Sequence, residues 1–205
     1  MEPLPDMITD SLNKFRIILA SRSPRRQQLL KELGLNFEIV IKEFPETFPE
    51  NLKGNEIALY VARQKAELFR NEITDNEIVI TADTIVWCNN MVLGKPSNED
   101  DAKRILKEIS DNTHEVITGV CILTSTLEKV FSVSTKVTFD AMSDDDIEYY
   151  IRSFRPFDKA GAYGIQEWIG IIGCSKIEGS YFNVVGLPVH QLYKELRELV
   201  QPVKK

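Results

Sequence analysis

Strand-like and helix-like patterns of hydrophobic residues alternate along this chain, which predicts an α/β fold. Short runs of apolar and β-branched residues predict strands at residues 15–20, 37–41, 77–88, 91–93, 116–124 and 129–139. Apolar residues at helical spacing predict helices at residues 24–33, 55–70, 99–109, 144–153 and 188–200. The segment 77–88 is strongly β-branched, so we expect it to form a central strand of the sheet.

Polar and small residues predict where several of these elements begin and end. Helix N-caps are expected at Ser23, Asn55, Ser97 and Ser143. Pro24 suits the first position of its helix, and Gly34 suits the position just after the end of that helix. Asn89 and Asn90 predict a hairpin turn between the strands at 77–88 and 91–93.

The chain has no internal repeat and no linker rich in Pro, Gly or Ser. We therefore expect one domain over residues 15–200, an N-terminal extension at residues 1–14 and a frayed tail at residues 201–205. The first residues lack the pattern of a signal peptide, and no stretch approaches 18 uninterrupted apolar residues. Three cysteines, far apart in the sequence, match no disulfide framework or zinc spacing. These features predict a cytoplasmic protein without a membrane partner.

Charge is unevenly distributed along the chain. The 205 residues include 25 Lys and Arg and 31 Asp and Glu, a formal net charge of −6. This acidic balance argues against a general nucleic-acid partner, which would require a basic surface. Residues 14–31 nevertheless contain six cations and no acidic residue.

The first candidate for chemistry is the segment 20–26, which joins a predicted buried strand to a predicted helix. A helix N-terminus exposes unpaired N–H groups and carries a partial positive charge, so it attracts anions. Acidic residues would stabilise this first turn, yet the sequence has Arg25 and Arg26 there. With the hydroxyl groups of Ser21 and Ser23, these guanidinium groups would bind phosphate strongly. The alternative is a solvated basic face of an amphipathic helix.

The second candidate is Asp83, which interrupts the apolar run of the strand at 77–88. A carboxylate in such a strand is costly unless it is paired, hydrogen-bonded or bound to a metal. If the strand ends or bends there, Asp83 faces a cleft as a metal ligand or a general base. If not, its carboxylate is satisfied by backbone amides at a break in the strand.

Three further features are weaker when each is taken alone. Lys95 lies between Gly94 and Pro96, and Lys65 lies on an otherwise apolar helix stretch. The segment 158–166 contains two glycines that allow close backbone approach, and it ends at Gln166, whose amide offers both a donor and an acceptor. No P-loop sequence is present. Together with the first two candidates, these residues suggest an enzyme that handles phosphate with a carboxylate-bound divalent metal.

Taken in order, the motifs resemble those of the Maf family of nucleoside triphosphate pyrophosphatases, over residues 16–200. They are Leu19-Ala20-Ser21-x-Ser23-Pro24-Arg25-Arg26, Ala82-Asp83-Thr84, Gly94-Lys95-Pro96, the segment 158–166 (DKAGAYGIQ) and Gly186-Leu187-Pro188. The resemblance implies an α/β fold with a long, twisted, mixed sheet, flanking helices and two lobes around a central cleft, akin to inosine triphosphatases. It also implies hydrolysis of a nucleoside triphosphate to the monophosphate and pyrophosphate with a divalent cation, usually Mg²⁺, with Mn²⁺ as an alternative.

Within the family, the sequence resembles the branch that acts on dTTP and UTP. The markers of that branch, and its expected specificity residues, are Arg25, Thr84 and Gln166. The alternatives are a pyrophosphatase for another or modified nucleotide, such as 7-methyl-GTP, and a nucleotide-binding regulator of cell division. The family also implies a role in nucleotide-pool control and a homodimer as the expected assembly.

The resemblance assigns a role to each further motif residue. Asp83 corresponds to the proton acceptor that activates water. The phosphate-binding residues implied are Ser21, Arg25, Arg26, Lys65 and Lys95. Glu46 and Asp83 are the implied ligands of the metal, with Glu43 as the alternative to Glu46.

Overall fold

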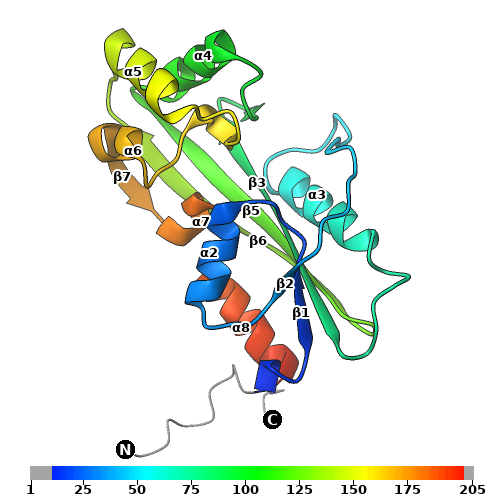
Figure 1. Ribbon diagram of the computed structural model, residues 1–205. Coiled ribbons are helices and arrows are strands. Elements are labelled where there is room, and N and C mark those ends of the chain that lie inside the picture. The colour runs from blue at the N-terminus through cyan, green and yellow to red at the C-terminus, as the bar shows by residue number, and fades with distance from the viewer. Residues whose placement is uncertain (1–10, 201–205) are drawn as a thin grey trace, which may run out of the picture.

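The computed structural model describes residues 11–200, and within them a seven-stranded mixed sheet forms the centre of the protein (Figure 1). The strand order is β2-β1-β3-β5-β6-β7, with β4 paired to β3. The strands are β1 (Arg16–Leu19), β2 (Glu38–Ile39), β3 (Glu77–Cys88), β4 (Met91–Leu93), β5 (Asn112–Leu123), β6 (Glu128–Phe139) and β7 (Cys174–Glu178). β1 runs parallel to β2 and β3, and every other pairing is antiparallel. The predicted α/β class with a long mixed sheet is therefore confirmed.

The helices cover the two faces of the sheet unequally. They are α2 (Pro24–Glu32), α3 (Asn55–Glu67), α4 (Glu99–Ile109), α5 (Asp144–Phe154), η1 (Ala160–Ala162), α6 (Trp168–Gly173), α7 (Tyr181–Val185) and α8 (Val189–Val200). Successive residues of a strand point to opposite faces. Val79 of β3 packs in the cluster of α3, whereas its neighbour Ile80 packs in the cluster of α2 and α8.

The face opposite α3 is divided into two lobes. Ile80 and Ala82 contact the helices α2 and α8 at one end of this face. Val86, on the same face, belongs to a second cluster with α4, α5 and α6 at the other end. Figure 1 shows these two groups of helices separated along the strands, with α3 on the other side of the sheet. This arrangement matches the predicted two lobes.

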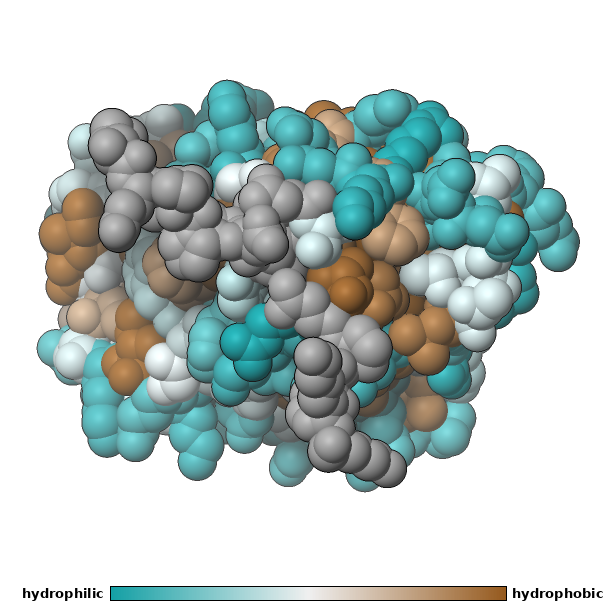
Figure 2. Space-filling model, turned by 90° about the horizontal axis from the view of Figure 1, so that it is seen from below, coloured by the Kyte–Doolittle hydropathy of each residue, from teal (hydrophilic) through white to brown (hydrophobic). Residues whose placement is uncertain are grey.

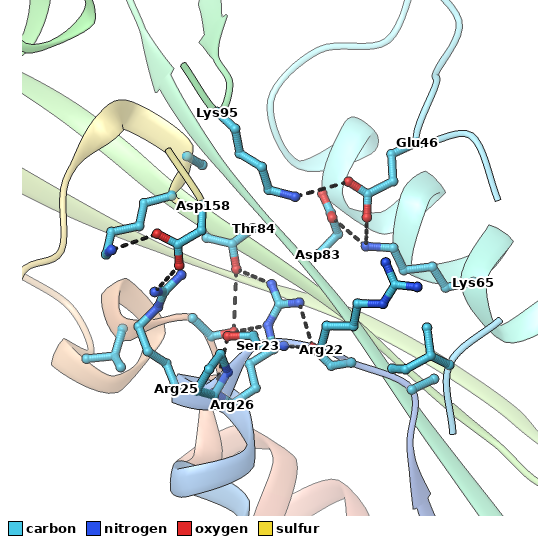
Figure 3. A pocket seen from close by; sticks show the side chains of 18 of the residues that line it. Arg22, Ser23, Arg25, Arg26, Glu46, Lys65, Asp83, Thr84, Lys95 and Asp158 are labelled. Atoms are coloured by element: carbon cyan, nitrogen blue, oxygen red, sulfur yellow. Dashed lines mark hydrogen bonds and ion pairs between the residues drawn. The ribbon is translucent and has the colours of Figure 1, made fainter. Parts of the chain in front are cut away.

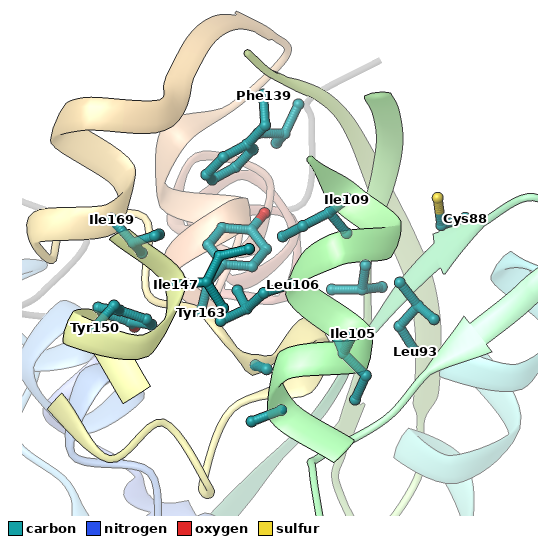
Figure 4. Close-up of a cluster of buried hydrophobic side chains, with 14 of the residues drawn as sticks. Cys88, Leu93, Ile105, Leu106, Ile109, Phe139, Ile147, Tyr150, Tyr163 and Ile169 are labelled. Atoms are coloured by element: carbon teal, nitrogen blue, oxygen red, sulfur yellow. The ribbon is translucent and has the colours of Figure 1, made fainter. Parts of the chain in front are cut away.

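The second cluster is a well-packed hydrophobic core (Figure 4). Leu106 and Ile109 of α4 point toward Tyr163 and toward Ile147 of α5, whereas Ile105 lies toward Leu93, and all of these side chains are buried. The apolar spacing of both helices produces this interface, because residues three or four apart share one helix face. Seen from below the view of Figure 1, the surface is largely hydrophilic around its rim, with separate hydrophobic patches (Figure 2).

Several predicted boundaries are confirmed and others are wrong. Asn89 and Asn90 form the hairpin turn with φ of 48° and 61°, the left-handed region that a type I′ turn requires. The N-cap of α4 is Asn98 and not Ser97, because the Asn98 side chain accepts the N–H of Asp101. Helix α3 begins at Asn55, but its N-cap is Gly54, which has no side chain to cap with.

The sequence predicted an interruption of β3 at Asp83, and this prediction is wrong. The pairing with β5 continues through Asp83, which lies opposite Gly119. The carboxylate is accommodated because it projects from the strand to a lysine, so the backbone has no need to break. The prediction also missed η1, α6, β7 and α7, which are short, and the first four residues of β5.

Part of the predicted N-terminal extension lies among the described residues. Leu12 is fully buried in the cluster of α2 and α8. The predicted tail at 201–205 and the first ten residues of the extension lie outside the described residues.

Candidate active site

A cleft of about 970 Å³ lies at a gap in the pairing of β3. On one edge, β3 pairs with β1 up to Ile80 and with β4 from Val86 onward. Between these points β3 has no strand partner on that edge within residues 11–200. Asp83 and Thr84 lie in this gap, and both line the cleft. The end of β1 and the start of β4 thus create the opening that the functional side chains fill.

The N-terminus of α2 forms one wall of the cleft (Figure 3). Ser23 is the N-cap as predicted, and its side chain accepts the N–H of Arg26. Ser21 is buried just before it and accepts the N–H of Ser23 at 3.2 Å. The first turn of α2 contains no acidic residue. The basic N-terminus of α2 therefore lines a cleft, and it does not form the solvated basic face that was the alternative prediction.

Arg26 joins three separate parts of the chain. Its Nη1 donates to the Ala82 carbonyl in the gap of β3, its Nη2 to Thr84 Oγ1 and its Nε to the Gly186 carbonyl, each at 2.8 Å. Burial lowers the pKa of this guanidinium group, although the charge of Asp83 opposes the shift. Most of the donors of Arg26 are therefore engaged within the protein, so it both holds the cleft together and supplies positive charge.

Asp83 lies in a cluster of alternating charges on the other side of the gap (Figure 3). Lys65 Nζ of α3 contacts Asp83 Oδ1 at 2.8 Å and Glu46 Oε1 at 2.7 Å. Lys95 Nζ lies 3.4 Å from the second oxygen of Glu46. Two carboxylates from distant segments therefore converge on one cation.

Glu46 is ionised in this cluster. Burial opposes its ionisation, but hydrogen bonds and charges from Lys65 and Lys95 outweigh that effect and hold the pKa of Glu46 below its usual value. Glu43, the alternative metal ligand, instead pairs with Arg22 at 2.5 Å. The geometry therefore places Glu46, and not Glu43, beside Lys65 and Asp83.

The opposite wall of the cleft comes from the segment 158–166. Arg25 Nη1 donates to Asp158 Oδ2 at 2.8 Å across the cleft. Gln166 is exposed and lines the cleft at the end of this segment. Thr84 Oγ1 accepts from Arg26 and lies 2.9 Å from Thr118 Oγ1, so its hydroxyl is fixed within the floor of the cleft.

All of the predicted site residues line this one cleft: Ser21, Arg25, Arg26, Glu46, Lys65, Asp83, Thr84, Lys95 and Gln166. Sequence reasoning gave no role to Asp158 and Lys159, although it quoted their motif. Lys159 is buried and therefore needs acidic partners, but the sequence alone carries no sign of that burial. The partner Glu167 lies just outside the quoted motif and was missed.

Comparison with known proteins gives a consistent set of relatives. The family model described as Maf-like protein matches residues 16–199. A dTTP/UTP pyrophosphatase of Phocaeicola vulgatus is 54% identical over 93% of this chain and 99% of its own length. A protein of the same name from Flavobacterium johnsoniae is 51% identical over 95% of this chain and 100% of its own.

A solved structure also resembles the chain, but only distantly. It is a nucleoside-triphosphatase / dITP/XTP pyrophosphatase from Mycobacterium abscessus, with 15% identity, a TM-score of 0.45 and coverage of 90% of this chain and 96% of that chain. In the part of the chain that the structure describes, no helix has the length and apolar character needed to cross a membrane.

Proposed function

Because this chain belongs to the Maf family, we propose that its cleft hydrolyses dTTP and UTP to the nucleoside monophosphate and pyrophosphate. The observation that carries this proposal is the position of Asp83 at the unpaired edge of β3. There it lies between a basic helix N-terminus and the Lys65–Glu46 pair. A protein that only bound nucleotides would have no need of a carboxylate at that point.

The triphosphate would lie along the α2 wall of the cleft. Arg25, Lys65, Lys95 and the positive end of the α2 dipole supply positive charge for its oxygens. Arg26 adds charge from a fixed position, since Ala82, Thr84 and Gly186 hold its guanidinium group. Such preorganised cations stabilise the charge that develops on the leaving pyrophosphate.

Asp83 would act as the general base. Its Oδ1 accepts from Lys65, which leaves Oδ2 to accept a proton from water. The resulting hydroxide attacks a phosphorus of the triphosphate, the bond to the pyrophosphate group breaks, and the pyrophosphate leaves with its electron pair.

The residues of the cleft also fit a divalent cation. Asp83 and Glu46 offer hard oxygen ligands that already converge on one positive charge, the Lys65 ammonium group. Mg²⁺ is commonly held by one or two carboxylates, with phosphate oxygens and water in its other positions. When bound, the ion would neutralise phosphate charge, and Mn²⁺ would suit the same ligands.

Substrate selection would come from the opposite wall. Gln166 presents an amide to the base, and a site built to hydrogen-bond one base edge discriminates against bases that lack it. Thr84 contributes by fixing Arg26, and Arg25 by its contact across the cleft. We further propose that the enzyme controls nucleotide pools in the cytoplasm, where the free thiols Cys88, Cys121 and Cys174 would stay reduced.

A nucleotide panel tests the proposal. Pyrophosphate release is measured with dTTP, UTP, CTP, ATP, GTP and 7-methyl-GTP in the presence of Mg²⁺. We expect dTTP and UTP to be the preferred substrates, and Asp83→Asn to lower turnover by at least about 100-fold while nucleotide binding persists. Binding without any turnover would exclude an enzyme, and preference for 7-methyl-GTP would exclude the dTTP/UTP assignment.

A further inference from the structure

Four charged side chains form a continuous chain across the cleft, from α2 to the start of α6. We call Arg25, Asp158, Lys159 and Glu167 the cross-cleft charge chain. Arg25 contacts Asp158 at 2.8 Å, Lys159 Nζ contacts the other oxygen of Asp158 at 2.7 Å, and the same Nζ contacts Glu167 Oε1 at 3.2 Å. Positive and negative groups alternate along it. Figure 3 shows Asp158 and Arg25 facing each other.

Lys159 is the buried centre of this chain. Only 9% of its side chain is exposed, whereas 56% of the Asp158 side chain is exposed. A buried ammonium group is tolerated only when it is paired, and Lys159 is paired with two carboxylates. Lys159 and Arg25 in turn outweigh the effect of burial on Asp158 and hold its pKa below the usual value. The position of Lys159 is therefore fixed by charges on both of its sides.

The far end of the chain fixes the turn that presents Gln166. Glu167 accepts a short hydrogen bond from the Tyr150 hydroxyl, and that hydroxyl accepts the N–H of Gly164 at 3.0 Å. The N–H of Glu167 donates to the Gly164 carbonyl at 2.9 Å, which closes the turn. A Cβ at Gly164 would lie 2.8 Å from the Glu167 carboxyl carbon, so the carboxylate packs directly on this glycine. Gln166 is therefore held in a tight turn with its side chain exposed to the cleft.

We propose that Lys159 is a positioning residue for base discrimination, which holds Arg25 on the phosphate side and Gln166 on the base side in one fixed arrangement. The inference rests on the proposed function, because it concerns how the same cleft selects among nucleoside triphosphates. It adds Asp158, Lys159 and Glu167 to the residues that determine specificity, although only Arg25 and Gln166 would touch the substrate.

The test compares Lys159→Met with the wild-type enzyme. Methionine has a similar length without the charge, so it breaks both ion pairs and unties the turn at Glu167 from Asp158 and Arg25. We expect the ratio of kcat/KM for dTTP to that for CTP to fall at least about fivefold. The inhibition constant of pyrophosphate should change less than about twofold, because Lys65 and Lys95 remain in place and Arg25 keeps its charge and its pair with Asp158. Lys103→Met is the matched control, since Lys103 also pairs with carboxylates but lies between α4 and α5, away from the cleft.

A second variant covers the case in which Lys159→Met fails to fold. Asp158→Asn removes the middle carboxylate, and the exposure of this side chain makes a folded variant the expected result. Its dTTP/CTP ratio should fall in the same direction. An unchanged ratio in a folded, active variant, or an equal fall in Lys103→Met, would overturn the inference. If the wild-type enzyme hydrolyses no nucleotide, the proposed function fails instead, so the two failures are distinguishable.

Discussion

Asp83 lies directly opposite Gly119 in the antiparallel pairing of β3 and β5. Opposed residues point to the same face, so the absence of a side chain at Gly119 leaves space beside the carboxylate. The backbone of α3 uses this space: a Cβ at Gly119 would lie 2.2 Å from the Ala58 carbonyl oxygen. Because α3 lies this close to the sheet, its Lys65 reaches Asp83.

Substitution of Gly119 by alanine should therefore displace α3. The new Cβ would meet backbone atoms of Ala58 and Leu59 in α3, and these atoms cannot move aside as a flexible side chain would. We expect Gly119→Ala to lower the free energy of unfolding by about 3 kcal/mol, as measured by urea denaturation. Gly94→Ala is the control, because a Cβ there meets nothing within 4 Å, and it should change stability by less than about 0.5 kcal/mol. Similar losses in both variants would contradict the close approach.

Replacement of Arg26 should cost more stability than replacement of Arg25. Lysine at position 26 cannot reproduce the planar set of donors that satisfies Ala82, Thr84 and Gly186. Each buried acceptor left unpaired costs about 1–3 kcal/mol. Among the described residues, Arg25 has one hydrogen-bonded partner, a half-exposed carboxylate, so Arg25→Lys should cost less than about 1 kcal/mol. Thermal and urea unfolding of the two variants measure the difference, and equal losses would argue against a holding role for Arg26.

His114 should make the protein less stable in acid. It is buried, its Nε2 lies 2.8 Å from the Tyr163 hydroxyl, and burial lowers its pKa from 6.5 to about 4. Between these two values the unfolded chain binds a proton that the folded protein does not, so stability falls as the pH falls through this window. The contribution of His114 amounts to about 3 kcal/mol over the whole window.

Urea denaturation at a series of pH values between 6.5 and 4 tests this expectation. Carboxylates with lowered pKa values change stability in the same direction, so the informative quantity is the difference from a variant. His114→Gln should show a shallower decline than the wild type. The exposed His190 provides the control, and His190→Gln should keep the wild-type slope. Parallel curves for all three proteins would show that His114 is not held neutral.

Glu46 and Glu43 form a natural pair for testing the metal ligands. Glu46 contacts Lys65 and Lys95, whereas Glu43 contacts only Arg22 among the residues described. We expect Glu46→Gln to weaken Mn²⁺ binding in the presence of nucleotide at least about tenfold, and Glu43→Gln to change it less than about twofold. Electron paramagnetic resonance of free Mn²⁺ measures the Mn²⁺ affinity of each variant. The reverse order would assign the ligand to Glu43.

Gln166→Glu tests base recognition at the residue that would touch the base. The substitution keeps the shape of the side chain but replaces its amide donors with acceptors. We expect discrimination between dTTP and CTP, measured as a ratio of kcat/KM, to fall about tenfold or more. Product inhibition by pyrophosphate should change much less. An equal loss in both measurements would argue that Gln166 does not contact the base.

The sequence predicted the elements that bear the site better than it predicted their connections. Ser23 and Pro24 predict the start of α2, because a capping hydroxyl and a fixed φ both favour the first turn of a helix there. The uninterrupted course of β3 through Asp83 was not predictable, since it depends on Gly119, 36 positions later, and on Lys65 in a helix. Local patterns carry no information about such distant partners.

The role of Thr84 and the cross-cleft charge chain were also beyond sequence reasoning. Thr84 stays a predicted specificity residue, and local patterns could not show that its hydroxyl accepts from Arg26, a residue 58 positions away. Lys159 and Glu167 are separated by a turn whose geometry depends on the Tyr150 hydroxyl of α5. The family motifs identified which residues gather in the cleft, whereas the hydrogen bonds decide which of them remain free to bind a substrate.

The gap in the pairing of β3 also bears on how this protein avoids aggregation. A stretch of strand with free backbone groups is a template for another strand, and proteins usually protect such edges with charges or covering segments. Here the guanidinium group of Arg26 donates a hydrogen bond to the Ala82 carbonyl, and the acidic side chain of Asp83 projects from the same stretch of β3. The side chains that prepare the cleft for a polyanion therefore also prevent a foreign strand from completing the sheet.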